Sequence, residues 1–403
     1  MNSPDSVNHE PIPQQTERLY YLDWLRLLAF GLLFIFHSWR PFDHFEWHIK
    51  NEEKHVIFDV LTMFTHGWRM HLIFLVSGAG TWFAMRARRE TFLLDRIKRL
   101  IVPFIFGILI LIPPQRYFEW TMFRDFEEGI WKFLMVYPVD QLGAKMGSSV
   151  LLWFGHLGTH LWYLPYLFVM TMVCMPLFKR IREGKISLAW LKDILSTRFG
   201  VYVLVVPMVT CRFLLKPLYP DYTDWSDFLF YLWPFVYGFM FVAEREMIAF
   251  VKSKRHLLLF TGILSSGIFL YLGSTNAEMV QSYISPEFNW LHLANTVIAS
   301  FIAISWTLFF LGYFAETMNF THKILMPANA SILPIYLLHQ TMIVIIGFYI
   351  VSFSMSLFLK FALIAMTAIP SSILLYQLIK RNTVTRFLFG MKPSKIPVRR
   401  LHG

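Results

Sequence analysis

The feature that most limits how this chain can fold is a series of apolar segments that recurs from one end to the other. Each segment is about as long as a helix that crosses a bilayer, for which about 20 apolar residues are needed. Because 56% of the 403 residues are hydrophobic and 18% are aromatic, the chain has far more apolar surface than a soluble domain of this size needs. We therefore predict an all-α, polytopic membrane protein.

Apolar runs and the charges between them predict about ten membrane spans. The predicted spans are residues 20–39, 59–85, 100–114, 150–178, 199–217, 227–243, 256–273, 290–314, 329–352 and 356–379. Residues 19–380 thus form one predicted transmembrane domain between a polar tail at 1–18 and a basic tail at 381–403. The N-terminal tail has no basic n-region, so we expect the first span to be retained and not removed as a signal peptide.

Charged residues alternate in sign from loop to loop. Basic clusters follow predicted spans two, four and six and fill the C-terminal tail, whereas the loops after spans one and five are acidic or mixed. The positive-inside rule then places both termini in the cytoplasm. The net charge of +11 follows from this topology, so we expect the chain to meet a lipid bilayer and its substrates, and no nucleic acid.

The first predicted span contains an arginine and a histidine. Arg26 and His37 are eleven residues apart, almost three helical turns, so both side chains face the same way, ~16 Å apart along the axis. A cation at mid-membrane costs ~2.5–3.5 kcal/mol, so Arg26 needs a polar cavity or a partner. The simpler interpretation pairs Arg26 with Asp23 and makes His37 an interfacial residue. The alternative is a polar path with chemistry at one end.

Several motifs are similar to those of one family. They are Arg26-x10-His37, the run Arg69-Met-His-Leu-Ile-Phe-Leu-Val-Ser77-Gly78, Arg96-Ile-Lys-Arg99 followed by Pro103, His160-Leu-Trp-Tyr-Leu, Asn329 to His339, and Phe387 to Pro393. In this order they resemble the acyltransferase-3 membrane acyltransferases, and most of all the branch that succinylates periplasmic glucans. The resemblance extends over nearly the whole chain, from about residue 18 to residue 393.

The resemblance implies transfer of an acyl group across the bacterial cytoplasmic (inner) membrane. The donor would be cytoplasmic acyl-CoA, either succinyl-CoA or acetyl-CoA, and the acceptor a hydroxyl of an extracytoplasmic carbohydrate such as a periplasmic glucan. By its match to the family motif, His37 is expected to be the general base, because an imidazole of pKa ~6.5 can take the proton of an attacking hydroxyl. His71 and His339 are further catalytic candidates.

Donor binding is expected to fall mainly on arginines. Arg26 would meet the pantetheine or phosphate end of the donor, and Arg96 and Arg99 its nucleotide phosphates, because guanidinium forks match phosphate oxygens. Arg69 could meet the carboxylate of a succinyl group or shape the acceptor pocket. Ser77 and Gly78 would allow close backbone approach along the acyl channel. The simpler interpretation of Arg96 and Arg99 is an ordinary basic loop.

Two histidine pairs have the i,i+4 spacing of helical metal ligands: His44 with His48, and His156 with His160. Neither has the glutamate of a His-Glu-x-x-His motif and no third ligand is evident, so no metal is expected. His160 and His339 could also be structural hydrogen-bonding residues between packed spans. The competing function is a proton-coupled transporter or flippase for a sugar or lipid-linked intermediate, which buried Arg and His residues would also suit. The oligomeric state stays open.

Overall fold

The computed structural model describes residues 18–87, 90–143 and 149–392, and this part of the chain is helical without any strand. The predicted all-α fold is thus confirmed. Of the two predicted tails, residues 1–17 and 393–403 lie outside the described residues. The helices are α1 (Tyr20–Trp39), α2 (Val56–Ala87), α3 (Phe92–Arg96), α4 (Val102–Phe106), α5 (Ile112–Phe123), α6 (Ile130–Gly143), α7 (Val150–Gly158), α8 (Tyr163–Arg182), α9 (Ala189–Ser196), α10 (Val205–Leu215), α11 (Trp225–Ala243), α12 (Glu246–Ser253), α13 (Arg255–Thr275), α14 (Ala277–Ile284), α15 (Trp290–Thr317), α16 (Leu325–Val351), α17 (Leu357–Ile379) and α18 (Thr383–Leu388).

Eight helical segments of the described chain are long and apolar enough to cross a membrane. Each corresponds to one of the ten predicted spans, and the third, predicted at 100–114, extends in the structure over Phe92–Phe123. Two predicted spans do not correspond to any of these eight segments. The second is the 32-residue helix α2, which carries Asp59 and Arg69 in its apolar sequence. The fifth is a shorter apolar helix, Gly200–Leu215.

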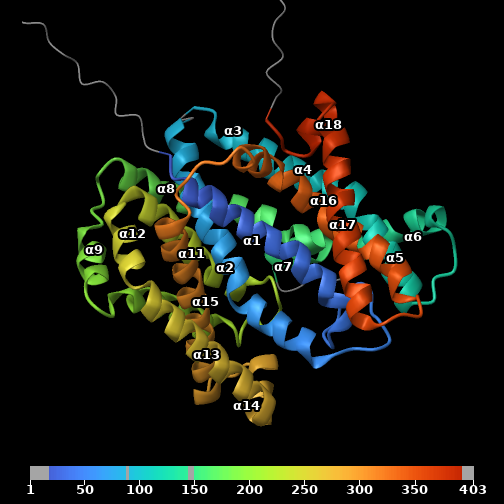
Figure 1. The fold of residues 1–403 in the computed structure, drawn as a ribbon, viewed down its shortest axis with the longest axis horizontal. Helices are drawn as coiled ribbons and strands as arrows, with labels where there is room; N and C mark the ends of the chain where they lie inside the picture. The colour runs from blue at the N-terminus through green and yellow to red at the C-terminus, as the bar shows by residue number, and fades with distance from the viewer. Residues whose placement is uncertain (1–17, 88–89, 144–148, 393–403) are drawn as a thin grey trace, which may run out of the picture.

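The arrangement of the helices separates two ends of the molecule (Figure 1). The short helices α3 and α18 lie at the top of the view. Helix α14 lies at the bottom, and the loop that joins α1 to α2 turns in the lower half. We call these the inner and the outer end, because the positive-inside rule predicts that the first faces the cytoplasm.

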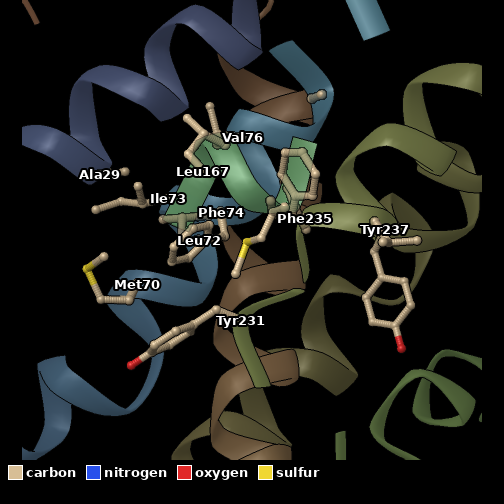
Figure 2. Packing of buried hydrophobic residues seen from close by; sticks show 14 of the residues in the cluster. Ala29, Met70, Leu72, Ile73, Phe74, Val76, Leu167, Tyr231, Phe235 and Tyr237 are labelled. Carbon is tan, nitrogen blue, oxygen red and sulfur yellow. The ribbon is translucent and has the colours of Figure 1, made fainter. Parts of the chain in front are cut away.

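The centre of the fold is the crossing of α2 and α11. A Cβ atom added at Gly78 would lie 1.8 Å from the backbone oxygen of Phe235, and one added at Gly238 would lie 1.8 Å from that of Leu75. The two backbones therefore touch, which only glycine on both helices allows. Buried side chains of α2 such as Leu72 fill the space between α1, α8 and α11 around this crossing (Figure 2).

Side-chain caps begin several of the helices at the outer end. Asp224 accepts the backbone N–H of Trp225 at 2.8 Å at the start of α11. Asn289 accepts that of His292 at 2.9 Å at the start of α15, and Asn276 caps α14 in the same way. A side-chain acceptor satisfies an N–H that the helix itself leaves unpaired. The caps thus fix where these helices begin, next to the cavity described below.

Candidate active site

A cavity of about 1000 Å³ lies between α1, α2, α5, α7 and α8 on one side and α13 to α16 on the other. Most of its wall is aromatic or aliphatic. Apart from tyrosines, its titratable lining residues are arginines and histidines: Arg40, Arg69, Arg116, His37, His48, His66, His156, His160 and His339. Apolar walls with a few convergent polar groups are typical of a small-molecule site. This cavity is therefore the candidate active site.

Three histidines from three different helical segments meet in the cavity. The ring of His339 on α16 lies 5.1 Å from that of His37 on α1, and 5.1 Å from that of His160, just before α8. Nδ1 of His339 lies 2.5 Å from the carbonyl oxygen of Tyr336. Because a carbonyl only accepts hydrogen bonds, this Nδ1 carries the proton and Nε2 keeps its lone pair. That Nε2 and Nδ1 of His37 are buried without a hydrogen-bond partner in the described structure.

Arg69 places a positive charge beside these histidines. Its side chain on α2 is 3% exposed, and the guanidinium lies over the ring of Phe36, 3.6 Å from its centroid. Nε and Nη1 of Arg69 have no hydrogen-bond partner in the described structure. The charge acts on both His37 and His339. A buried cation with two free donors next to a free imidazole nitrogen can hold an anion where acid–base chemistry takes place.

The other two arginines of the cavity wall are ion-paired. Arg40 forms an ion pair with Asp43 at 2.6 Å, and Arg116 forms one with Glu119 at 2.7 Å. Arg69 has no such carboxylate among the described residues, and the lining of the cavity contains no aspartate or glutamate. Arg40 and Arg116 therefore each have a carboxylate partner, whereas Arg69 next to the histidines has none in the described structure.

A second polar cluster lies toward the inner end, outside the cavity. Arg26 lies 3.7 Å from Asp23, as the simpler interpretation predicted, and its Nη2 lies beside Gly80 of α2. Arg96 donates to Thr81 at 2.7 Å. Arg26 and Arg96 both act electrostatically on Tyr163, which lines the cavity. The cluster and the cavity thus adjoin at this tyrosine.

Tyr163 lies between the inner cluster and the cavity. Its hydroxyl lies 2.5 Å from Oγ of Ser77, and its ring packs edge-on against Phe30 and Tyr336, with centroids 6.1 and 5.8 Å away. Ser77 itself donates to the carbonyl of Ile73 at 2.7 Å. The predicted acyl-channel residue Ser77 therefore forms part of the boundary between the arginine cluster and the cavity.

The structure separates the predicted site residues into groups. His37, Arg69 and His339 line the cavity, whereas Arg26, Ser77 and Arg96 belong to the inner cluster or its boundary. The remaining three do not line the cavity. His71 packs between Phe230 and Tyr231, with ring centroids 4.6 and 4.9 Å away; Gly78 faces α11; and Arg99 donates to the carbonyl of Gly390 at 3.4 Å. All of their functional roles remain predictions.

A polar group at the outer end of the cavity was not among the predicted site residues. Nδ1 of His48 forms a short hydrogen bond with the carboxylate of Glu119, which also accepts from Arg116 at 2.7 and 3.0 Å. Burial lowers the pKa of His48, so its imidazole is neutral at neutral pH. The i,i+4 spacing of His44 and His48 was a signal at this position, but it suggested metal ligation. No group of three or more metal-binding side chains occurs among the residues that the structure describes.

Comparison with known proteins places the chain in a family. Residues 19–377 match the acyltransferase domain of the acyltransferase-3 family, so the chain belongs to that family, as its motifs predicted. Fold, cavity and family together define a polytopic membrane protein of the acyltransferase class. No solved structure shows a significant match to the chain.

The chain is also similar to curated proteins over almost their whole length. It is 25% identical over 399 residues to the glucans biosynthesis protein C of Escherichia coli O81 (strain ED1a), covering 95% of this chain and 96% of that protein. The same figures hold for the proteins of that name from strains SMS-3-5 / SECEC and K12 / DH10B. The similarity therefore includes every helix that lines the cavity.

Proposed function

We propose that this protein transfers an acyl group from cytoplasmic acyl-CoA to a hydroxyl of an extracytoplasmic carbohydrate, such as a periplasmic glucan. The observation that carries the proposal is the meeting of His37, His339 and the unpaired Arg69 in one cavity. Membership of an acyltransferase family and similarity to proteins named for glucan biosynthesis support it further. The cellular location that goes with this proposal is the bacterial inner membrane.

In the proposed reaction, His37 is the general base. Its imidazole takes the proton of the acceptor hydroxyl while the oxygen attacks the thioester carbon, so an O–H bond breaks and a C–O bond forms. The carbon–sulfur bond then breaks, and the thiolate leaves with the bonding electrons and receives the proton from the imidazolium. Ester and coenzyme A thiol are the products. His339 lies beside His37, with the two ring centroids 5.1 Å apart.

Arg69 supports an acyl group that itself carries a charge. Apart from Arg69, the arginines of the cavity wall are ion-paired, so a neutral ligand would leave one buried cation without compensation. The free carboxylate of a succinyl group would accept a charge-assisted hydrogen bond from this guanidinium. On this basis we propose succinyl-CoA as the donor, with acetyl-CoA as the alternative. The inner cluster of Arg26 and Arg96 would bind the phosphates of either donor.

The test is release of free thiol by purified protein in lipid vesicles, with succinyl-CoA or acetyl-CoA and a panel of glucose oligosaccharides. We expect release that the acceptor stimulates, and that His37→Gln lowers by about 10²–10⁴-fold, the usual contribution of a general base. His44→Gln is the matched control, because His44 lies in the loop after α1, outside the cavity lining. No release with either donor from folded protein would overturn the proposal and favour transport.

A further inference from the structure

The loop that joins α1 to α2 forms part of the cavity wall at its outer end. Asp43, which is fully buried, holds this loop: it accepts hydrogen bonds from Arg40 and Lys50, each at 2.6 Å, and from Thr62 at 2.8 Å. The loop carries Trp47, which lines the cavity together with His48. Both side chains therefore have a fixed place, although they lie between helices and not on one.

His48 has the orientation of a hydrogen-bonding group that is kept ready for a ligand. Glu119, held by Arg116, accepts hydrogen bonds only, so the proton of the neutral His48 ring resides on Nδ1. Nε2 then keeps its lone pair and can accept a hydrogen bond from a hydroxyl. A side chain fixed by a second, buried partner loses little freedom when it binds.

Trp47 connects this group to the reacting histidine. Its ring is nearly parallel to that of His37, at 19° with centroids 6.0 Å apart, and lies 5.6 Å from that of His48. Trp47 thus lies next to both His37 and His48 in the cavity wall, so a ring-shaped ligand that contacts Trp47 would lie near both imidazoles. Flat aromatic surface beside a fixed polar group suits the apolar face and the hydroxyls of a sugar ring.

We infer that Trp47, His48 and Glu119 form the subsite that binds the carbohydrate acceptor and presents its hydroxyl to His37. Trp47 supplies the stacking surface and His48 accepts a hydrogen bond from a neighbouring hydroxyl. Glu119 is a positioning residue that acts through His48. Arg40 and Arg116 at this end of the cavity are each ion-paired with a carboxylate, so neither is free to bind an anion and the subsite takes an uncharged sugar, in contrast to the unpaired Arg69. The inference rests on the proposed function and names its acceptor side.

The experiment compares acceptor and donor kinetics in vesicles that contain the full chain, with whichever glucose oligosaccharide stimulates thiol release by the wild-type protein. For His48→Gln and Trp47→Leu we expect the acceptor KM to rise by about tenfold or more, the value of one lost hydrogen bond or stacking contact. The donor KM should change less than the acceptor KM, and thiol release without acceptor should fall by a smaller factor than release with acceptor. Trp47→Phe should restore most of the acceptor affinity.

His44→Gln is the matched control, because it removes another histidine–carboxylate pair of the same loop, 2.7 Å from Asp59, without touching the cavity. An unchanged acceptor KM in His48→Gln and Trp47→Leu overturns the inference while the proposed function stands. Equal loss of acceptor-dependent and acceptor-independent release would assign both residues a structural role and also overturn it. If no oligosaccharide stimulates release by the wild type, both the proposed function and the inference fail.

Discussion

Arg69 offers the sharpest test of the donor. The substitution Arg69→Met removes the charge and the two free donors but keeps an unbranched apolar side chain of helical propensity in α2. Succinyl-CoA and butyryl-CoA are the two donors to compare, because their acyl chains have the same length and differ in a terminal carboxylate against a methyl group. Arg69→Lys keeps the charge and loses the planar fork, so it should lie between the wild type and Arg69→Met.

The magnitude follows from the free donors of Arg69. Nε and Nη1 are buried and unpaired, so the guanidinium has no carboxylate of its own among the described residues, and the carboxylate of a succinyl donor would supply a charge-assisted hydrogen bond to it. Hydrogen bonds to a charged group contribute ~1.5–3 kcal/mol, so Arg69→Met should lower the preference for succinyl over butyryl by about 10–150-fold. A side chain that is 3% exposed leaves little room for water to replace the lost contact.

The assay is the ratio of kcat/KM for the two donors, measured as thiol release with saturating acceptor. Arg124→Gln is the control, since this exposed arginine pairs with Asp140 at 3.4 Å and does not line the cavity. The reasoning is refuted if Arg69→Met lowers the rate with both donors by the same factor. Arg69 would then act on the oxyanion of the transition state, which both donors share.

Three further predictions concern stability, measured by thermal or denaturant unfolding in detergent. Gly78→Ala should destabilise the protein by at least ~1–3 kcal/mol, because its Cβ would meet the backbone of Phe235 at 1.8 Å. Gly31→Ala is the control, because a Cβ there has no atom within 4 Å and should not destabilise the protein. Equal losses of stability in the two variants would contradict this prediction. Asp43→Asn should cost ~3–5 kcal/mol, because it leaves two buried cations with a weaker partner; a loss below ~1 kcal/mol would show that the loop is held otherwise. Burial lowers the pKa of Lys50 to about 8 from 10.5, so between these values the unfolded chain binds a proton that the folded chain lacks. Stability should therefore rise with pH over that window, and Lys50→Met should abolish this rise; an unchanged pH dependence would contradict it.

The sequence was sufficient for the class of fold and for the family. Apolar length and loop charge are local properties, so eight predicted spans coincide with apolar helices of the structure. Helix α2 is an exception to prediction from apolar length. It is 32 residues long and lies at the centre of the fold, but its charged residues lower its hydropathy. Such a helix is stabilised by its neighbours and not by lipid.

Site residues could be predicted from the sequence only where they belong to a recognisable motif. His37, Arg69 and His339 were predicted singly, and the structure brings them to one cavity. His48 and Glu119 form a hydrogen bond although they are 71 positions apart in the sequence. No sequence periodicity predicts a contact between a loop residue and a helix so far along the chain. Gly78 was predicted to allow close approach along an acyl channel, but the segment that approaches it is the backbone of α11. A glycine in the sequence does not specify which group approaches it.

The boundary formed by Tyr163 and Ser77 has a consequence for where coenzyme A remains during the proposed reaction. The arginines that suit the nucleotide lie on its inner side, and the histidines lie beyond it. If acyl transfer proceeds as proposed, only the thin thioester arm of the donor passes this tyrosine, while the charged nucleotide stays where it was made. Free coenzyme A then stays in the cytoplasm, where it can be acylated again. The extracytoplasmic carbohydrate is thus acylated without export of coenzyme A from the cell.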